Sequence, residues 1–153
     1  MPGAWKVSEA ASIALHSAAF LAAHEGETFT AGEIADRLKV SKAHVQKVLG
    51  QLERSDILKA VRGPNGGFSL SKPSGEISLM MIFEAIEGPY QLKTCLMVTP
   101  CCKPGRCILD GLPASVDRQI KIFMESKRLS EVSQTYGDRN GERHEEPQKN
   151  HSN

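Results

Sequence analysis

The sequence predicts a mostly α-helical fold that carries one β-hairpin. Apolar residues recur at helical spacing in several segments, and two of these segments are short and separated by a tight turn. Two alternating runs joined by a glycine-rich segment follow them directly. Two short helices across a tight turn form a helix-turn-helix, and a hairpin directly after it is a wing. We therefore expect residues 1–89 to form a winged helix-turn-helix domain.

The first three helices have recognisable starts. Residues 8–23 are alanine-rich with apolar residues at helical spacing, which predicts a helix that packs under the rest. Thr30 and Glu33 have the spacing of a capping box, so a short second helix begins there. Ser41 is a good N-cap for a third helix. The apolar residues of this third helix fall on one face: Val45, Val48, Leu49 and Leu52.

The wing and a fourth helix follow. Residues 58–62 and 68–71 alternate apolar and polar side chains, and the segment between them contains three glycines, which suit a reversing chain. Ser78 can cap the next helix, and Gly88 followed by Pro89 is the expected order at a helix end. This fourth helix closes the core of the domain.

The rest of the chain divides into three parts. Residues 90–111 show no sustained periodicity but hold all four cysteines, and a loop of that length is uncommon unless it has a task. Over 112–136 a helical stripe resumes at Val116, Ile120, Phe123 and Leu129, and such a separate helix usually buries its stripe against a second copy of itself. We expect a homodimer through this helix. Residues 137–153 lack apolar side chains, which predicts disorder.

Composition excludes several classes of protein. A chain of 153 residues with 40% hydrophobic and 24% charged residues fits one small domain with an appendage. We expect no membrane span and no secretory signal, and therefore a cytoplasmic protein. In the reducing cytoplasm, clustered cysteines indicate metal binding or redox chemistry and not disulfides. The sequence has no Rossmann or P-loop signature, and we expect no enzyme activity.

Charge indicates double-stranded DNA as the partner. The segment 37–72 holds eight basic and two acidic residues, a local net charge of +6 in a chain of net charge +1. Helix-turn-helix proteins read base edges from the N-terminal part of the second helix, where the outer face carries Lys42, His44, Gln46 and Lys47. The wing adds Arg62, a candidate for minor-groove insertion, and Asn65. The alternative interpretation is a basic, solvated face.

The cysteines indicate a metal site. Cys95, Cys101 and Cys107 are equally spaced with five residues in each gap, and Cys102 is an extra neighbour. Iron-sulfur clusters are held chiefly by thiolates, and a flexible loop can fold round one. Two alternatives stay open. Zinc with a fourth Cys or His would brace the loop, and a purely thiol-based switch would oxidise two cysteines.

From about Trp5 to Val132 the chain resembles the Rrf2 family of bacterial transcription regulators, which includes IscR-like and NsrR-like proteins. The segments that carry the resemblance are 5–8, 40–41, the wing segment 61–68, 82–88 and the equally spaced cysteines. The resemblance implies a [2Fe-2S] or [4Fe-4S] cluster on Cys95, Cys101 and Cys107, and a dimer formed through the helix that begins at Leu112.

The fourth ligand departs from the family patterns. IscR-like members use a His three residues beyond the last Cys, where this chain has Asp110. NsrR-like members use an Asp of the partner's first helix, where the aligned residue here is Ser12. A redox-sensing relative uses Glu and His of that helix, and His16 matches its His. His16 is therefore the candidate, with Asp110, Cys102 and Ser12 as alternatives.

These observations predict a homodimeric DNA-binding regulator, most simply a repressor, that senses redox state, nitric oxide or iron-sulfur status through a bound cluster. The alternative is a winged-helix regulator or protein-binding module that a zinc ion stabilises or that works through thiols alone.

Overall fold

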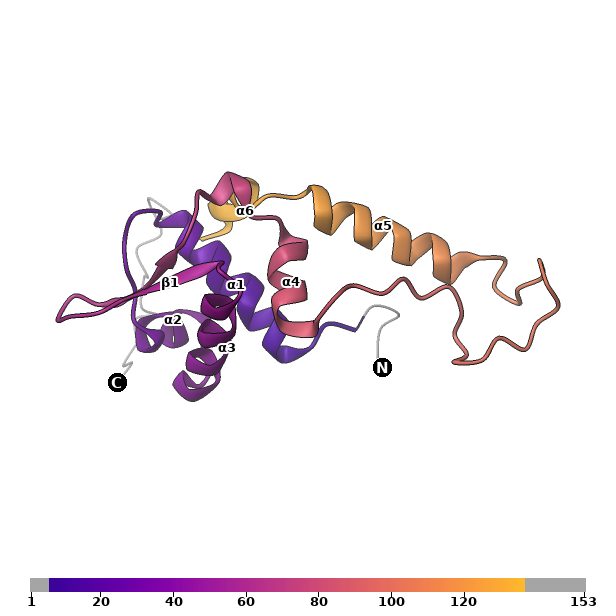
Figure 1. The fold of residues 1–153 in the computed structure, drawn as a ribbon, viewed down its shortest axis with the longest axis horizontal. Helices are drawn as coiled ribbons and strands as arrows, with labels where there is room; N and C mark the ends of the chain where they lie inside the picture. Colours follow the sequence, from indigo (N-terminus) through magenta and orange to yellow (C-terminus); the bar gives the residue numbers. More distant parts are fainter. Residues whose placement is uncertain (1–5, 137–153) are drawn as a thin grey trace, which may run out of the picture.

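Three helices and a hairpin form the N-terminal part of the described structure in the predicted order (Figure 1). The computed structural model describes residues 6–136, so Trp5 and the predicted disordered tail, 137–153, lie outside the described residues. The elements of this part are α1 (Glu9–Ala23), α2 (Ala31–Leu38), α3 (Lys42–Arg54), β1 (Leu58–Val61) and β2 (Gly67–Leu70).

The helix starts are set by side chains that cap them. The hydroxyl oxygens of Ser8 and Ser41 accept hydrogen bonds from the backbone N–H groups of the third residues beyond them. Thr30 and Glu33 form the complete capping box that their spacing predicts. The predicted starts of the first three helices are confirmed.

The core is built around α1. Helices α3 and α4 (Leu79–Glu87) and residues 129–135 pack against it, and nine of its fifteen residues are buried. Side chains from the four helices and from the residue before β1 meet there with less than 2% of their surface exposed, among them Leu21, Ile34, Leu49, Ile57 and Ile82. Burying an aliphatic side chain of this size stabilises a fold by about 1.5–3 kcal/mol. This helix therefore holds the helix-turn-helix in place.

The hairpin is antiparallel, with Leu58 opposite Leu70 and Val61 opposite Gly67. A third segment joins it, because the Phe29 and Phe68 backbones exchange two hydrogen bonds of 3.0 and 2.8 Å. At Gly67 a Cβ atom would lie 2.5 Å from the Phe29 carbonyl oxygen, so only glycine fits at this crossing. The wing is thus fixed to the segment that leads into α2.

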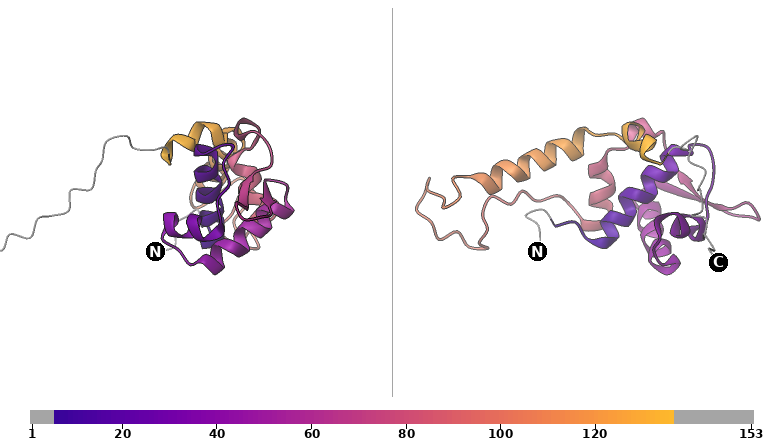
Figure 2. Two further views of the ribbon diagram at one scale, coloured as in Figure 1. Left: turned by 90° about the vertical axis from the view of Figure 1, so that its left-hand side faces the viewer. Right: turned by 180° about the vertical axis from the view of Figure 1, so that it is seen from behind.

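The chain then forms η1 (Ser74–Glu76) and α4 (Leu79–Glu87), which Ser78 caps and Gly88 ends as predicted. After the cysteine loop come α5 (Leu112–Ser126), α6 (Leu129–Val132) and η2 (Ser133–Thr135). The wing and the cysteine loop lie at opposite ends of the molecule, as Figure 1 and the right-hand view of Figure 2 show. Within residues 6–136, no helix has the length and apolar character that crossing a membrane requires.

The fifth helix ends earlier than the predicted range 112–136. After Ser126 the chain leaves the helix, and α6 packs back on α1 with Leu129 fully buried in the main core. Two backbone hydrogen bonds fasten this turn: Leu79 N–H donates to the Lys127 carbonyl (3.0 Å) and Leu129 N–H donates to the Ile77 carbonyl (2.9 Å). The assignment of Leu129 to the stripe of the long helix is therefore wrong, because tertiary packing overrides the local pattern.

The apolar stripe of α5 is also divided. Ile120 and Met124 pack with Phe83 and Tyr90 in a second, smaller cluster against α4. Phe123 remains 56% exposed on another side of the helix. The predicted stripe thus combines residues that pack within the chain with a residue that faces away from it.

Candidate DNA interface and cysteine loop

The N-terminal part of α3 presents an open basic face. Lys42, Gln46 and Lys47 are exposed, while Val45, Val48 and Leu49 are buried on the opposite side. Among the described residues, neither lysine is in an ion pair. Unpaired cations on an exposed helix face are available to phosphates, and an exposed amide side chain is available to base edges.

His44 lies at the edge of this face and not on it. Its ring nitrogen Nδ1 is 3.8 Å from a carboxylate oxygen of Glu9 in α1. It also lines a small hollow of about 190 Å³ together with Ser8 and Glu87, whose side chains are hydrogen-bonded to each other. The structure therefore places His44 beside α1 and the end of α4, in a hollow that Lys47 of the basic face also lines.

The wing tip carries the other two predicted DNA contacts. Arg62 and Asn65 are both exposed, and the described structure pairs Arg62 with no carboxylate. The tip is closed by a hydrogen bond from the Gly66 N–H to the Gly63 carbonyl (3.0 Å). The Thr28 hydroxyl donates to the Asn65 carbonyl (3.1 Å), which ties the tip to the segment before α2. The tip thus has a defined shape and a cation that forms no ion pair with residues 6–136.

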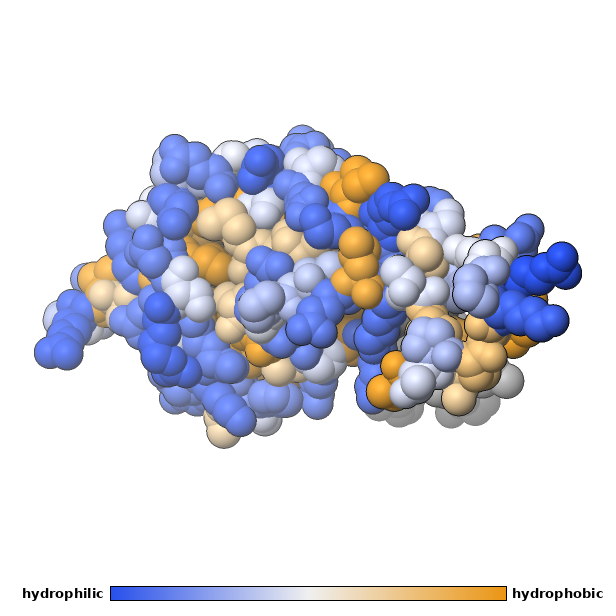
Figure 3. All heavy atoms as spheres, turned by 45° about the vertical axis from the view of Figure 1, so that its right-hand side comes forward, coloured by the Kyte–Doolittle hydropathy of each residue, from blue (hydrophilic) through white to orange (hydrophobic). Residues whose placement is uncertain are grey.

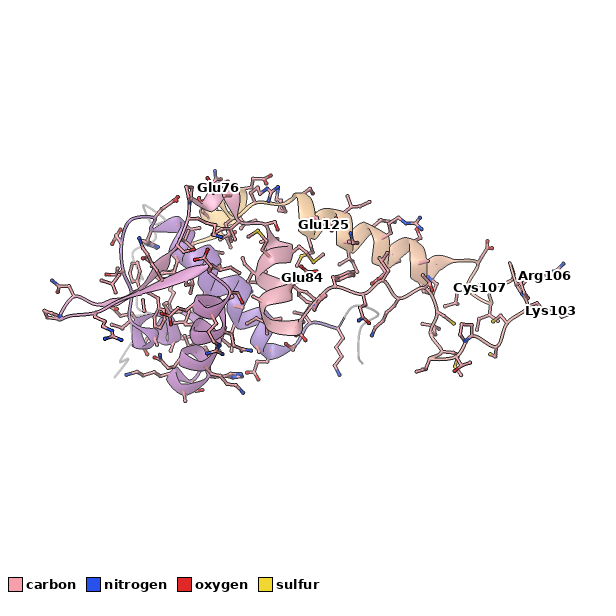
Figure 4. The ribbon with its side chains drawn as sticks, in the orientation of Figure 1. Glu76, Glu84, Lys103, Arg106, Cys107 and Glu125 are labelled. Atoms are coloured by element: carbon pink, nitrogen blue, oxygen red, sulfur yellow. The ribbon has the colours of Figure 1, made fainter. Side chains whose placement is uncertain are left out.

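The cysteine loop encloses a hollow at the far end of the molecule. The hollow has a volume of about 500 Å³, and Cys95, Cys102 and Cys107 line it together with Asp110. Lys103 and Arg106 lie at the tip beside Cys107 (Figure 4). All four cysteines are free thiols, with Cys95 half-buried and the others exposed. In residues 6–136, no three Cys, His, Asp or Glu side chains are gathered closely enough to hold a metal ion.

Two of the sulfur atoms have the surroundings of thiolate ligands. Backbone N–H groups of Met97 and Leu109 donate to the sulfur atoms of Cys95 and Cys107, each at 3.4 Å. Backbone N–H donation from Gly111, and then from Leu109, lowers the pKa of the Cys107 thiol. N–H···S hydrogen bonds of this kind also surround the sulfur atoms of iron-sulfur sites. The donor set of the loop fits a thiolate-bound group, around which the exposed cysteines would have to close.

The candidates for a fourth ligand fall into two groups. Asp110 and Cys102 line the hollow of the loop. Ser12 and His16 instead line a separate pocket of about 240 Å³ in the body of the molecule, with Arg37 and Tyr136. His16 is exposed, and its Nδ1 shares a hydrogen bond with the Tyr136 hydroxyl. Within one chain the structure does not bring His16 or Ser12 to the cysteines.

An apolar surface covers part of α5 and the loop. Exposed apolar side chains gather on these two segments, and Figure 3 shows hydrophobic surface between charged groups at this end of the molecule. These side chains are Leu92, Leu96, Met97, Val98, Ile108, Leu109, Leu112, Ile122 and Phe123. Large exposed patches of apolar surface typically mark interaction sites.

Several side-chain contacts at these sites were not predicted from the sequence. They include the contact of Glu9 with His44, that of Tyr136 with His16, and two hydrogen bonds that Asp117 accepts from the segment before Cys95. Each joins residues at least 24 positions apart, and no local pattern marks such pairs. For Tyr136 alone a signal existed, because it is the last apolar residue before the polar tail.

Comparisons with known proteins agree with this geometry. The sequence model of the Rrf2 family, described as iron-dependent transcriptional regulators, matches residues 7–135. The regulator IscR of Pectobacterium carotovorum is 26% identical over 130 residues, which cover 85% of this chain and 75% of IscR.

Solved structures share the fold. CymR, the global cysteine regulator of B. subtilis, superposes with a TM-score of 0.74 at 21% identity, covering 88% of this chain and 99% of CymR. IscR of T. potens gives a TM-score of 0.66 at 20% identity, covering 86% of this chain and 88% of that protein. These proteins are transcription regulators and not enzymes. With the family pattern extending over most of its length, the chain belongs to the Rrf2 family and is a winged helix-turn-helix transcription regulator.

Proposed function

We propose that this regulator senses redox state, nitric oxide or iron-sulfur status through an iron-sulfur cluster held by Cys95, Cys101 and Cys107. The observation that carries the proposal is the loop itself, where the sulfur atoms of Cys95 and Cys107 line one hollow and each accepts a backbone N–H. Cys101 is exposed in the same loop and would have to turn inward to bind the cluster. A bound cluster would be the group that reacts with oxidant or with nitric oxide.

The fourth ligand is proposed to be His16 of the partner subunit. His16 is exposed on α1, and its hydrogen bond to Tyr136 occupies Nδ1, which leaves Nε2 to bind metal. Since the two pockets are separate in one chain, this ligand has to come from a second copy. Asp110 and Cys102, which line the hollow, are the alternatives from the same chain.

The partner proposals are a homodimer and double-stranded operator DNA, with the protein acting as a repressor in the cytoplasm. The exposed apolar face of α5, at Leu112 and Phe123, supports pairing with a second copy. Lys42, Gln46, Lys47 and Arg62 support DNA contact, with Asn65 beside them at the wing tip. Because the loop continues directly into α5, cluster loss would change the position of the helix that sets the spacing of the two α3 helices.

Anaerobic reconstitution tests the cluster. Wild-type protein is expected to gain iron, sulfide and visible absorption. Replacing Cys95, Cys101 or Cys107 by Ala should abolish or strongly destabilise the cluster, and with it all three signals, while the far-UV circular dichroism stays unchanged. Cys102→Ala is the matched control, with a milder effect. His16→Ala should retain cluster with an altered spectrum, whereas Asp110→Ala should do little. A full, spectrally normal cluster in all three cysteine variants would contradict the proposal.

A second candidate is a thiol-based switch without a cluster. Its support is that Cys102, and not Cys101, lines the hollow with Cys95 and Cys107, and that all four thiols are free. CymR of Staphylococcus aureus, which shares the fold, has been solved in an oxidized form. A colourless protein that forms a loop disulfide on mild oxidation would favour this candidate, and stoichiometric zinc would favour a structural site.

A further inference from the structure

Asp117 joins the start of the cysteine loop to α5. The Tyr90 hydroxyl donates to Asp117 Oδ1 (2.8 Å), and the Lys93 backbone N–H donates to Asp117 Oδ2 (2.6 Å). Both carboxylate oxygens are therefore used by residues that precede Cys95. Hydrogen bonds to an ionised carboxylate are shorter and stronger than those between neutral groups. We call Tyr90, Lys93 and Asp117 the Asp117 clamp.

The clamp is itself attached to α4. The Tyr90 backbone N–H donates to a carboxylate oxygen of Glu84 (2.8 Å), and the Tyr90 ring lies 6.0 Å from that of Phe83. Burial, followed by the hydrogen bond and charge of Asp117, raises the pKa of Tyr90 to about 12. The hydroxyl therefore stays protonated and remains a donor at neutral pH. One tyrosine thus holds together the end of α4, the loop and α5.

The clamp is the last attachment of the outgoing arm of the loop. Over residues 94–111, the hydrogen bonds of the described structure connect the loop only to itself and to the start of α5. Cys95 lies two residues beyond Lys93, and it is the half-buried cysteine while the other three are exposed. On the return arm, Cys107 lies five residues before α5 begins at Leu112. Both ends of the hollow are therefore placed by the same helix.

We propose that Asp117 is a positioning residue that fixes the Cys95 side of the loop against α5 and so sets the placement of Cys95 for cluster binding. This inference rests on the proposed function for its cluster part only. An Asn at this position would keep the shape but replace one acceptor oxygen by an NH₂ group, which would face a donor. One of the two attachments would then be lost.

The test compares wild type, Asp117→Asn and Tyr90→Phe. Glu125→Gln is the matched control, because Glu125 lies on the same helix and pairs with Lys121 at the surface. The first readout is the alkylation rate of each cysteine in the metal-free full chain, followed by fragmentation mass spectrometry. Loss of a hydrogen bond worth about 1 kcal/mol should accelerate Cys95 alkylation about threefold to tenfold in both clamp variants. Cys101, in the exposed part of the loop, should react at its wild-type rate.

The second readout is the lifetime of the reconstituted cluster with a chelator present. The Asp117→Asn protein should load the wild-type amount of iron and lose it several-fold faster, while Glu125→Gln behaves as wild type. An unchanged rate at Cys95, or equal acceleration at Cys95 and Cys101, would overturn the clamp. Faster alkylation with an unchanged cluster lifetime would overturn the positioning role. If wild type binds no cluster, the proposed function fails, and the alkylation rates alone decide whether Asp117 places Cys95.

Discussion

Replacing Lys47 by alanine should weaken DNA binding at every sequence and also reduce its dependence on salt. Lys42 and Lys47 on α3 and Arg62 on the wing are exposed and unpaired among the described residues, which gives three cations per subunit and six in a dimer. Each neutralised phosphate contributes about −0.9 to the slope of log K against log salt, so six contacts predict a slope of about −5.4. Lys47→Ala removes two contacts per dimer and should reduce the slope to about −3.6.

Fluorescence anisotropy measures this slope, with a labelled operator selected from a random-sequence pool and NaCl varied from about 50 to 400 mM. Lys121→Ala is the matched control, because it removes the same charge from α5, where Lys121 pairs with Glu125. Gln46→Ala provides a second contrast. It should lower affinity for the selected operator by about 1–3 kcal/mol while leaving the slope unchanged, since base-edge contacts release no counterions.

Equal slopes for wild type and Lys47→Ala would refute the reasoning, because an exposed lysine at a phosphate has to change the number of released ions. A slope reduced equally by Lys121→Ala would also refute it. In that case net charge, and not the face of α3, would account for the salt dependence.

Further substitutions test the dimer and the fold. Phe123→Glu should shift the protein to a monomer in analytical ultracentrifugation without lowering its melting temperature. Leu129→Ala should lower the free energy of unfolding by about 2–5 kcal/mol in denaturant, because Leu129 is fully buried. A monomeric Leu129→Ala protein of unchanged stability would instead place Leu129 at the dimer interface. Thr30→Ala removes the cap of α2 and should lower the free energy of unfolding by about 1 kcal/mol. Hydrogen bonds from the Thr30 backbone and hydroxyl lower the pKa of Glu33 below its unfolded value of 4.5. The ionised Glu33 therefore contributes to the free energy of unfolding above pH 4.5, and this contribution is lost as the pH falls through the lower pKa of the folded state. Glu33→Gln should therefore lose less stability than wild type on acidification, and parallel acid-unfolding curves would show that the pair does not form.

The sequence predicts best what short-range chemistry decides. Four helices begin where a hydroxyl oxygen accepts a hydrogen bond from the backbone N–H three residues further along the chain. The hydroxyls belong to Ser8, Thr30, Ser41 and Ser78, and all four bonds are found. The hairpin depends on glycines between alternating runs, and it also forms where predicted. These elements need no knowledge of the rest of the chain.

Contacts between distant segments were outside the reach of periodicity. The predicted face of α3 includes His44, but the approach of Glu9 from another helix draws this side chain to the edge. Leu129 continues the spacing of the apolar stripe on α5 and yet packs on α1, because the chain turns after Ser126. The fourth-ligand candidates were separated in the same way, since only the fold shows that His16 and the cysteine loop lie in different pockets.

The two backbone hydrogen bonds between residues 77–79 and 127–129 make α5 a lever arm with a fixed base. The C-terminal end of α5 does not act as a hinge, because the turn after Ser126 is also held by the burial of Leu129 in the core. At 1.5 Å per residue the fifteen residues of α5 span about 22 Å, so moving the loop end by about 2 Å tilts the arm by about 5°. With a rigid base, that tilt passes to the whole DNA-reading body. We therefore expect a change at the loop to alter the angle between the two subunits of the proposed dimer, while the packing inside each subunit stays unchanged.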